Sequence, residues 1–255
     1  MKFSIITPTY KRVNKLTRAV ESVLGQTYTD LEMIIINDSP DDTEYSSFEK
    51  NISDPRIIYL KNEKNEGVNF SRNRALDNIS NNSSWVIFLD DDDWFVNDTL
   101  ITFKKLTEQN PNNSWFMTNR AYVNGTSLTR VPKNNLLYSY AWSYLILKRI
   151  KGDATHCIRT KALENIRFSG SIKQGEEWFF FYQLGLKNRF YYNNHNSTIS
   201  DGYDMESGLN FRKLSRLTKI KNSLNLFNEG LSKRSAYRPT FIFYILGRML
   251  VTFFK

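Results

Sequence analysis

The first part of the chain is made of two kinds of segment, which differ in how their apolar and polar residues are spaced. Short runs that are almost entirely apolar are typical of buried parallel strands, and stretches with apolar residues three or four positions apart are typical of amphipathic helices. The expected strands cover residues 2–7, 31–36, 56–60 and 85–89, and the expected helices cover residues 11–25, 41–51, 70–79 and 96–109. This alternation predicts a doubly wound α/β fold with a mostly parallel sheet.

The second half of the chain has a less regular pattern. Strands are expected at residues 115–123, 154–159 and 190–194, and Gly175-Glu176-Glu177-Trp178 opens another helix. Residues 124–151 show no clear element, and such a segment could move over a ligand. The composition changes near residue 209, which predicts one domain over residues 1–208 followed by a basic, partly apolar helical tail over residues 209–255.

An acidic run follows the fourth expected strand. The apolar residues 85–89 lead directly into four carboxylates, Asp90 to Asp93. Ligands of open α/β sheets bind outside the carboxyl ends of the strands, and the second expected strand also ends near an acid, Asp38. Adjacent carboxylates repel one another unless a cation neutralises them, and oxygen ligands suit Mg²⁺ or Mn²⁺. The run therefore predicts a metal site, with a solvated acidic loop that caps the next helix as the alternative.

The backbone conformation decides which of these carboxylates share a face. In an extended backbone, alternate side chains point to opposite sides. Asp90 and Asp92 would then point one way, and Asp91 and Asp93 the other.

Positive charge is concentrated in the tail. The chain has 35 basic and 26 acidic residues, a net charge of +9. Residues 210–255 contain ten Lys or Arg and a single acid, Glu229, so the remaining chain is neutral. Within residues 241–254 the single charge is Arg248, and the stretch is shorter than the roughly 20 apolar residues of a membrane span. An interfacial helix on an anionic leaflet is one expectation; a helix packed on the protein's own core or on a second subunit is the other.

The single cysteine and the N-terminal residues indicate in which cellular compartment the protein is expected. The single cysteine, Cys157, excludes an intrachain disulfide and is expected to be buried. The few apolar residues before Pro8 are too short for a signal peptide. We therefore expect a cytoplasmic protein, which the tail could attach to the cytoplasmic face of the inner membrane.

Five short motifs, in order and plausibly spaced, resemble those of family 2 glycosyltransferases. They are Ser4-Ile5-Ile6-Thr7-Pro8-Thr9-Tyr10; Glu21-Ser22-Val23-Leu24 with Gln26-Thr27-Tyr28; Ile36-Asn37-Asp38-Ser39; Asn65-Glu66-Gly67-Val68 with Ser71-Arg72-Asn73; and Phe88-Leu89-Asp90-Asp91-Asp92-Asp93, at the place of the family's metal-binding DxD. The resemblance covers roughly residues 3–195. It implies the GT-A fold, with residues 1–110 as the nucleotide-sugar-binding half and residues 111–208 as the acceptor-binding half.

The resemblance also implies an activity and a donor site. The family moves a sugar, with inversion, from a nucleotide-diphosphate sugar that is usually a UDP-sugar. The implied donor-site residues are Thr7, Pro8, Thr9, Tyr10, Asp38, Arg72, Asp90 and Asp91. Asp38 would accept a hydrogen bond from the base, Arg72 would lie near the base or diphosphate, and Asp90 would contact the ribose or the metal's water shell. Asp92, with Asp90, would bind Mn²⁺ or Mg²⁺, which neutralises charge on the diphosphate leaving group.

One-step inversion needs a base that takes the proton from the acceptor hydroxyl. The resemblance places it in a Glu-Asp pair at the start of a late helix, here Glu176-Glu177. Glu177 stands at the aspartate position with a side chain one methylene longer, and Glu176 is the second candidate. The alternative is two acids that stabilise a helix N-terminus. His195 is a candidate for the metal or diphosphate, with a structural role as its alternative.

Together these features predict an inverting, metal-dependent glycosyltransferase of surface polysaccharide synthesis, with a glycan or lipid-linked acceptor. Two alternatives are a non-catalytic nucleotide-sugar-binding subunit and a sugar nucleotidyltransferase. The loop at residues 8–12 lacks the glycines that the second class uses. The neutral body argues against nucleic acid as a partner, and a homodimer stays open.

Overall fold

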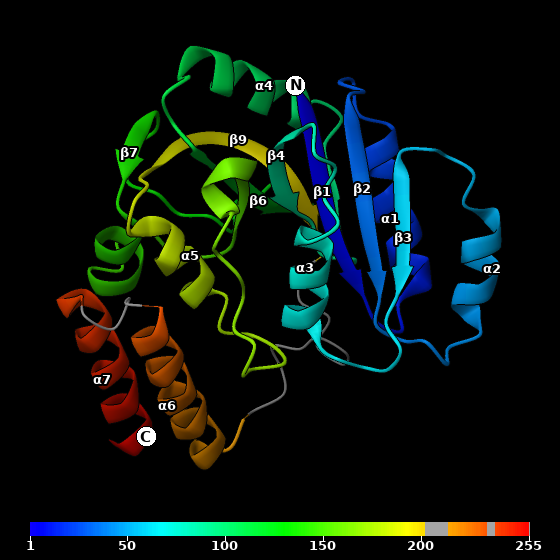
Figure 1. The fold of residues 1–255 in the computed structure, drawn as a ribbon. Helices are drawn as coiled ribbons and strands as arrows, with labels where there is room; N and C mark the ends of the chain where they lie inside the picture. The colour runs from blue at the N-terminus through cyan, green and yellow to red at the C-terminus, as the bar shows by residue number, and fades with distance from the viewer. Residues whose placement is uncertain (202–213, 234–237, 255) are drawn as a thin grey trace.

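The computed structural model describes residues 1–201, 214–233 and 238–254. Strands and helices alternate through its first half as the hydrophobic pattern predicts (Figure 1). The elements are β1 (Lys2–Thr9), α1 (Val13–Leu24), β2 (Leu31–Asn37), α2 (Glu44–Asn51), β3 (Ile57–Lys61), α3 (Val68–Leu76) and β4 (Ser83–Phe88). Each strand expected here is confirmed within one or two residues at either end.

The remaining elements extend this sheet and add the tail. They are β5 (Asp93–Phe95), α4 (Thr99–Gln109), β6 (Trp115–Tyr122), β7 (Leu136–Tyr138), the π-helix η1 (Tyr140–Ile146), β8 (Ala154–Arg159), the 3₁₀-helix η2 (Thr160–Leu163), α5 (Trp178–Gly185), β9 (Phe190–Ser200), α6 (Arg216–Ser232) and α7 (Pro239–Phe254). The strand order in the sheet is β3-β2-β1-β4-β8-β6-β9-β5, and β7 pairs with β9.

Most strands of this mixed sheet run in one direction. β1 to β4 are mutually parallel, β8 is antiparallel to β4 and β6, and β9 is parallel to β6. The carboxyl ends of β1, β2, β4, β6 and β9 therefore meet at one edge of the sheet. The predicted mostly parallel α/β fold is confirmed, and Asp38, which follows β2, and Asp90, which follows β4, lie at this edge.

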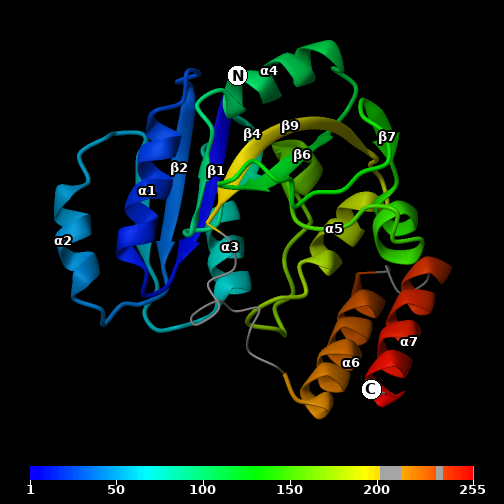
Figure 2. The same ribbon diagram turned by 180° about the vertical axis from the view of Figure 1, so that it is seen from behind.

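Helices cover both faces of the sheet (Figures 1 and 2). Ile5, Met33 and Ile35 pack in one buried cluster with residues of α1 and α4. Their neighbours Ile6 and Ile34 pack in a second cluster with residues of α3 and α5. Because successive side chains of a strand point to opposite faces, a strand that is covered on both sides is buried at every position, as β2 is.

Three elements depart from the sequence pattern. β9 continues to Ser200, although residues 193–196 are polar, because it pairs with β6 through backbone hydrogen bonds around register shifts. β5 is a three-residue strand that pairs with the end of β9, where the pattern predicted a connection. Residues 124–151, which showed no clear pattern, contain β7 and η1. Cys157 is buried, as expected.

The tail helices α6 and α7 lie side by side (Figures 1 and 2). Phe241 and Ile245 of α7 are buried, and the Phe241 ring lies 5.3 Å from the Tyr182 ring and 5.8 Å from the Phe179 ring of α5. The tail thus packs on the protein's own core. The predicted boundary at residues 208 and 209 lies outside the described residues. In the described part of the chain, no helix is both long enough and apolar enough to span a membrane.

Candidate functional site

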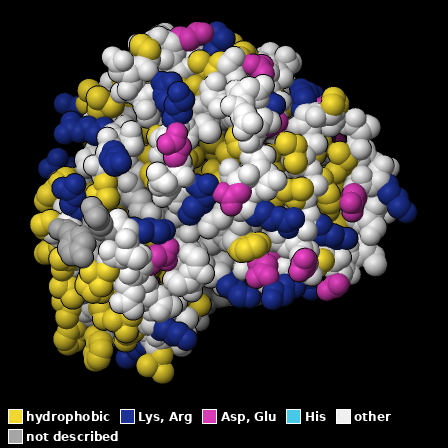
Figure 3. Space-filling view, viewed as in Figure 1, with side chains coloured by type: hydrophobic (Ala, Val, Ile, Leu, Met, Phe, Trp, Pro, Cys, Tyr) yellow, Lys and Arg dark blue, Asp and Glu magenta, His cyan; other side chains and the backbone are white. Residues whose placement is uncertain are grey.

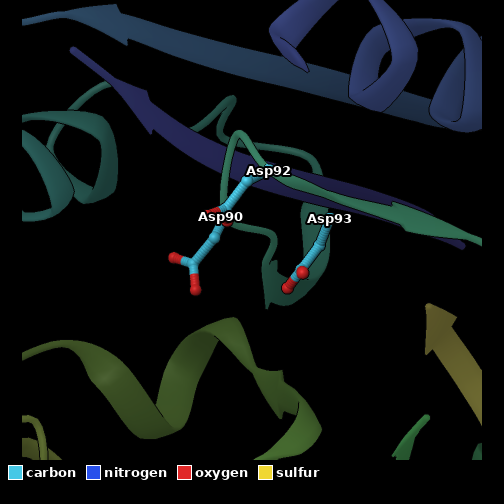
Figure 4. A group of neighbouring side chains, drawn as sticks. All are labelled: Asp90, Asp92 and Asp93. Atoms are coloured by element: carbon cyan, nitrogen blue, oxygen red, sulfur yellow. The ribbon is translucent and has the colours of Figure 1, made fainter. Parts of the chain in front are cut away.

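The acidic run forms a tight turn between β4 and β5. The Asp93 amide donates to the Asp90 carbonyl over 3.1 Å. The backbone is therefore not extended, and the alternating arrangement of the four carboxylates is not found. Asp90, Asp92 and Asp93 come together instead (Figure 4), while Asp91 turns towards β1.

Asp90, Asp92 and Asp93, here called the acidic group, have the donor set of a hard-cation site. Each offers one carboxylate oxygen, and these oxygens lie within 4.8 Å of one another. Asp93 is buried, and its Oδ1 has no hydrogen-bond partner in the structure. A buried acceptor without a partner is costly, and a bound cation would satisfy it. The group therefore fits Mg²⁺ or Mn²⁺. It contains the predicted ligands Asp90 and Asp92, adds Asp93, and does not include the third candidate, His195.

Three arginines surround the acidic group. Arg12 Nη1 lies 2.9 Å from Asp92 Oδ2, and Arg72 Nη2 donates to Asp90 Oδ1 over 2.8 Å. Arg120 pairs with Asp93 and lies 3.6 Å from Asp90 Oδ2. Burial acts to raise the pKa of Asp90, but the charges of Arg72 and Arg120 outweigh it and lower that pKa.

Sequence reasoning missed Arg12 and Arg120. Arg12 ends the loop after β1, and Arg120 lies near the carboxyl end of β6, at the same edge of the sheet as Asp90. The rule that ligands bind beyond the carboxyl ends of strands was a signal for both residues.

Asp91 joins the acidic turn to the predicted nucleotide pocket. Thr9 Oγ1 donates to Asp91 Oδ2 over 2.8 Å, and the Tyr10 amide lies 3.4 Å from the same oxygen. Burial raises the pKa of Asp91 to about 7, and the charge of Asp92 acts in the same direction. Thr7 is buried, with an Oγ1 that has no hydrogen-bond partner in the structure; Pro8 pairs with Ile36 of β2.

Asp38 organises the loop that leads into α3. Asn62 Nδ2 and the Glu66 amide donate to Asp38 Oδ1 over 2.7 and 2.8 Å, and the Gly67 amide donates to Oδ2 over 2.8 Å. Gly67 has a φ of 94°, and a Cβ there would lie 2.5 Å from the Lys173 carbonyl oxygen. A carboxylate has about four acceptor positions, and these three bonds leave roughly one of them on the buried Asp38 side chain.

Arg72 links the acidic group to the predicted base. Its Nη1 donates to Glu177 Oε1 over 3.1 Å, while its Nη2 holds Asp90. The Glu177 side chain is 43% exposed, so an acceptor can reach it. Glu176 points elsewhere: it accepts hydrogen bonds from Trp178 Nε1 and from Arg248 of α7. The structure thus places Glu177, and not Glu176, beside the acidic group.

His195 is not brought to the acidic group. Its Nε2 lies 3.1 Å from Asp98 Oδ1, and its Nδ1 lies 3.0 Å from Ser197 Oγ. On β9 it precedes Ser200, the partner of Asp93, by five residues, which is about 16 Å along a strand. These contacts agree with a structural role for His195, which was the alternative to a contact with the metal or the diphosphate.

We predict that the metal-free protein loses stability as the pH rises from about 5 to 8. Burial raises the pKa of Asp91 to about 7, and burial raises that of Asp93 to about 7 against the lowering effect of Arg120. Between the unfolded pKa and these values the folded state binds more protons, so the free energy of unfolding falls with rising pH. The loss should reach several kcal/mol, or roughly 10 °C in Tm.

Thermal melts with EDTA at pH 5, 6, 7 and 8 test this expectation. Mn²⁺ binds deprotonated carboxylates, so it should flatten the dependence. Asp54→Asn is the control, because Arg56 holds the pKa of Asp54 at about 2, below the range of the titration. A Tm that stays constant or rises with pH in EDTA would contradict the prediction.

The chain matches a known family over most of this site. The model of glycosyl transferase family 2 matches residues 4–168, more than half of the chain. A curated relative from Campylobacter jejuni, GalNAc(5)-diNAcBac-PP-undecaprenol beta-1,3-glucosyltransferase, is 29% identical over 203 residues, which cover 74% of this chain and 62% of the relative. The first curated relatives that the chain matches are longer, and it spans 15% to 62% of their lengths.

Solved structures share the fold. Residues 1–349 of S. aureus TarS in complex with UDP-GlcNAc superpose with a TM-score of 0.70 at 21% identity, covering 89% of this chain and 67% of that one. The mannosyltransferase PcManGT from Pyrobaculum calidifontis, in complex with GDP-Man and Mn²⁺, has a TM-score of 0.61 at 16% identity, covering 97% and 68%. At these identities the likeness shows the fold, and it confirms the GT-A expectation.

Proposed function

The chain belongs to glycosyl transferase family 2, and from this premise we propose that it moves a sugar, with inversion, from a UDP-sugar to a glycan or lipid-linked acceptor in surface polysaccharide synthesis. The observation that carries the proposal is the position of Arg72, which holds Asp90 with one nitrogen and Glu177 with another. The proposed metal-binding carboxylate and the proposed base thus contact different nitrogens of one buried guanidinium. Family membership favours this activity over a sugar nucleotidyltransferase.

The acidic group would hold the divalent ion. Asp92 and Asp93 supply carboxylate oxygens beside Asp90, and Mn²⁺ or Mg²⁺ bound there would neutralise charge on the departing diphosphate. Arg12 and Arg120 keep these acids close together despite their repulsion. The complex of PcManGT with Mn²⁺ supports such an ion in this fold.

The donor nucleotide would lie along the carboxyl ends of β1 and β2. Thr7, Pro8, Thr9 and Tyr10 line this edge, and Asp91 holds Thr9 and Tyr10 against the acidic turn. Asp38 keeps an acceptor position for the base while it fixes the loop before α3. The UDP-GlcNAc complex of TarS supports UDP as the nucleotide.

Glu177 would act as the general base. It takes the proton from the acceptor hydroxyl as that oxygen attacks the anomeric carbon, and the bond from this carbon to the diphosphate oxygen breaks on the opposite face. The nucleoside diphosphate leaves with the electron pair of that bond. Arg72 orients the Glu177 carboxylate during this step and stays protonated, because nearby Asp90 and Glu177 raise its pKa against the effect of burial.

Calorimetric titration of UDP with and without Mn²⁺ tests the donor site, and a panel of nucleotide sugars assayed for nucleotide release then tests the reaction. We expect binding that needs the ion and release from at least one UDP-sugar. The absence of UDP binding under both conditions would overturn the proposal. Binding without release from any sugar, with glycan and undecaprenyl-diphosphate acceptors present, would favour the non-catalytic subunit.

The tail is proposed to contact an anionic membrane surface at the cytoplasmic face, as a peripheral attachment. α7 buries Phe241 and Ile245 but exposes a second apolar face, in which Phe243 is 70% and Phe254 85% exposed. Figure 3 shows hydrophobic side chains gathered over α7 at the lower left. The positive charge of the tail complements anionic lipid, and the Campylobacter relative is named for an undecaprenol-linked substrate.

We predict that Phe243→Glu with Leu250→Glu lowers binding to vesicles of phosphatidylglycerol and phosphatidylcholine by at least about tenfold, since a buried CH₂ contributes about 0.8 kcal/mol. The fraction of protein that floats with the vesicles measures this binding. Val123→Glu, at an apolar residue 66% exposed outside the tail, is the matched control. Truncation of α7 is unsuitable because it would uncover Trp178 and Phe179.

Unchanged flotation of the double variant would show that α7 does not bind lipid. If the unchanged chain sediments as a dimer and the double variant sediments as a monomer, the exposed face binds a second copy.

A further inference from the structure

Two charged residues of the tail contact the loop that carries the proposed base. Glu229 is the single acid of residues 210–255, and Arg248 is the single charge of residues 241–254. Ser169 and Ser171 donate to Glu229 Oε2 over 2.7 and 3.3 Å. Arg248 Nη2 donates to Glu176 Oε1 over 2.6 Å. Both ends of the loop at residues 169–177 are thus held by the tail.

The backbone of this loop is held in an uncommon conformation where it meets Arg248. Glu176 has a φ of 63°, next to Gly175 with a φ of 74°. A non-glycine residue in the left-handed region costs free energy and persists only when its surroundings impose it. Here the surroundings are Arg248 and Trp178 Nε1, which hold both oxygens of a Glu176 side chain that is 11% exposed.

Arg248 is itself held in place by aromatic rings. Its guanidinium lies 5.5 Å from the centre of the Trp178 ring and 5.7 Å from that of Tyr244, distances suited to cation–π attraction. Ile245 and Phe241, which are buried, anchor α7 one and two turns before Arg248. The ion pair with Glu176 therefore joins two well-packed elements and not two mobile side chains.

The orientation of Glu177 depends on this arrangement. The Phe179 amide donates to the Glu176 carbonyl over 3.0 Å, and the Phe181 amide donates to the Glu177 carbonyl over 3.2 Å. These bonds start α5 and fix the direction in which the Glu177 side chain leaves the backbone. A rotation at Glu176 would displace the Glu177 carboxylate from Arg72 and from the acceptor.

We propose that α7 is a working part of the active site, in which Arg248 is a positioning residue that holds Glu176 and, through it, aims Glu177 at the acceptor hydroxyl. This inference rests on the proposed function of Glu177. It assigns the tail a role in the reaction that is separate from its contact with lipid.

The first test is Arg248→Gln, assayed as nucleotide release from whichever UDP-sugar the panel identifies, with water as acceptor. We expect kcat to fall about 10- to 100-fold, because small misplacement of a reacting group has effects of this size. The Kd of UDP with Mn²⁺ should stay within about twofold, since that Kd reports donor binding alone. Arg248→Lys, which keeps the charge, should recover part of the loss. Arg238→Gln, an exposed arginine at the start of α7, is the matched control and should leave kcat unchanged.

A double-mutant cycle separates positioning from general destabilisation. If Arg248 acts through Glu176, the variant Glu176→Gln/Arg248→Gln should lose no more than the more impaired single variant. Independent losses that multiply would overturn the proposal, as would unchanged kcat in Arg248→Gln. A loss in Glu176→Gln as large as that in Glu177→Gln would also overturn it, because Glu176 would then be the base.

If Arg248→Gln does not fold, Arg248→Lys takes its place in the cycle. Wild-type protein that fails to bind UDP would overturn the proposed function. Wild-type protein that binds UDP and turns over, with the variants equally active, would overturn this inference alone.

Discussion

Glu177→Gln is expected to lower kcat for nucleotide release by about 10²- to 10⁴-fold, the usual contribution of a general base. Glutamine keeps an oxygen that can accept from Arg72 Nη1, which lies 3.1 Å from Glu177 Oε1 in the wild type, but it cannot take a proton. The Kd for UDP with Mn²⁺ should therefore stay close to the wild-type value. Steady-state release assays and calorimetry on the same preparation measure the two quantities.

Glu108→Gln is a suitable control for this variant, because Glu108 is an exposed residue of α4 that pairs with Lys104. It should be as active as the wild type. Full activity of Glu177→Gln would show that Glu177 is not the base.

Asp92→Asn should weaken Mn²⁺-dependent UDP binding by about 10²-fold or more, since changes even to groups behind a metal's ligands cost 10- to 100-fold. The Asp92 side chain is 28% exposed, so its replacement should leave the fold intact. Asp93→Asn should have the same effect on binding, because Asp93 also belongs to the acidic group.

Asp98→Asn is the control for the ion site, because Asp98 contacts His195 and lies outside the acidic group. Calorimetric titrations of UDP with Mn²⁺ present and absent compare the variants. UDP binding in Asp92→Asn and Asp93→Asn that keeps its full dependence on Mn²⁺ would show that the ion binds elsewhere.

The sequence by itself determined the order of elements and the edge at which the site lies. β2 is apolar at five of its seven positions, and the two exceptions, Glu32 and Asn37, lie at or near its ends. Such a pattern is typical of a strand that is covered on both faces. The acids after β2 and β4 then had to lie at the same edge of the sheet, because parallel strands end at one edge. The order of the elements and the edge of the site can thus be predicted from local periodicity and sheet topology, without knowledge of side-chain contacts.

Only the tertiary structure decided which side chains act together. The tight turn at Asp90 to Asp93 puts Asp93 in the acidic group and turns Asp91 away, and Arg120 reaches the group from β6, 27 residues after Asp93.

The tertiary structure likewise separated Glu177 from Glu176 and packed α7 on α5. These outcomes depend on backbone turns and on pairings between residues far apart in the chain. Side-chain direction at such places follows from φ, ψ and packing, and no periodic pattern in the sequence records them.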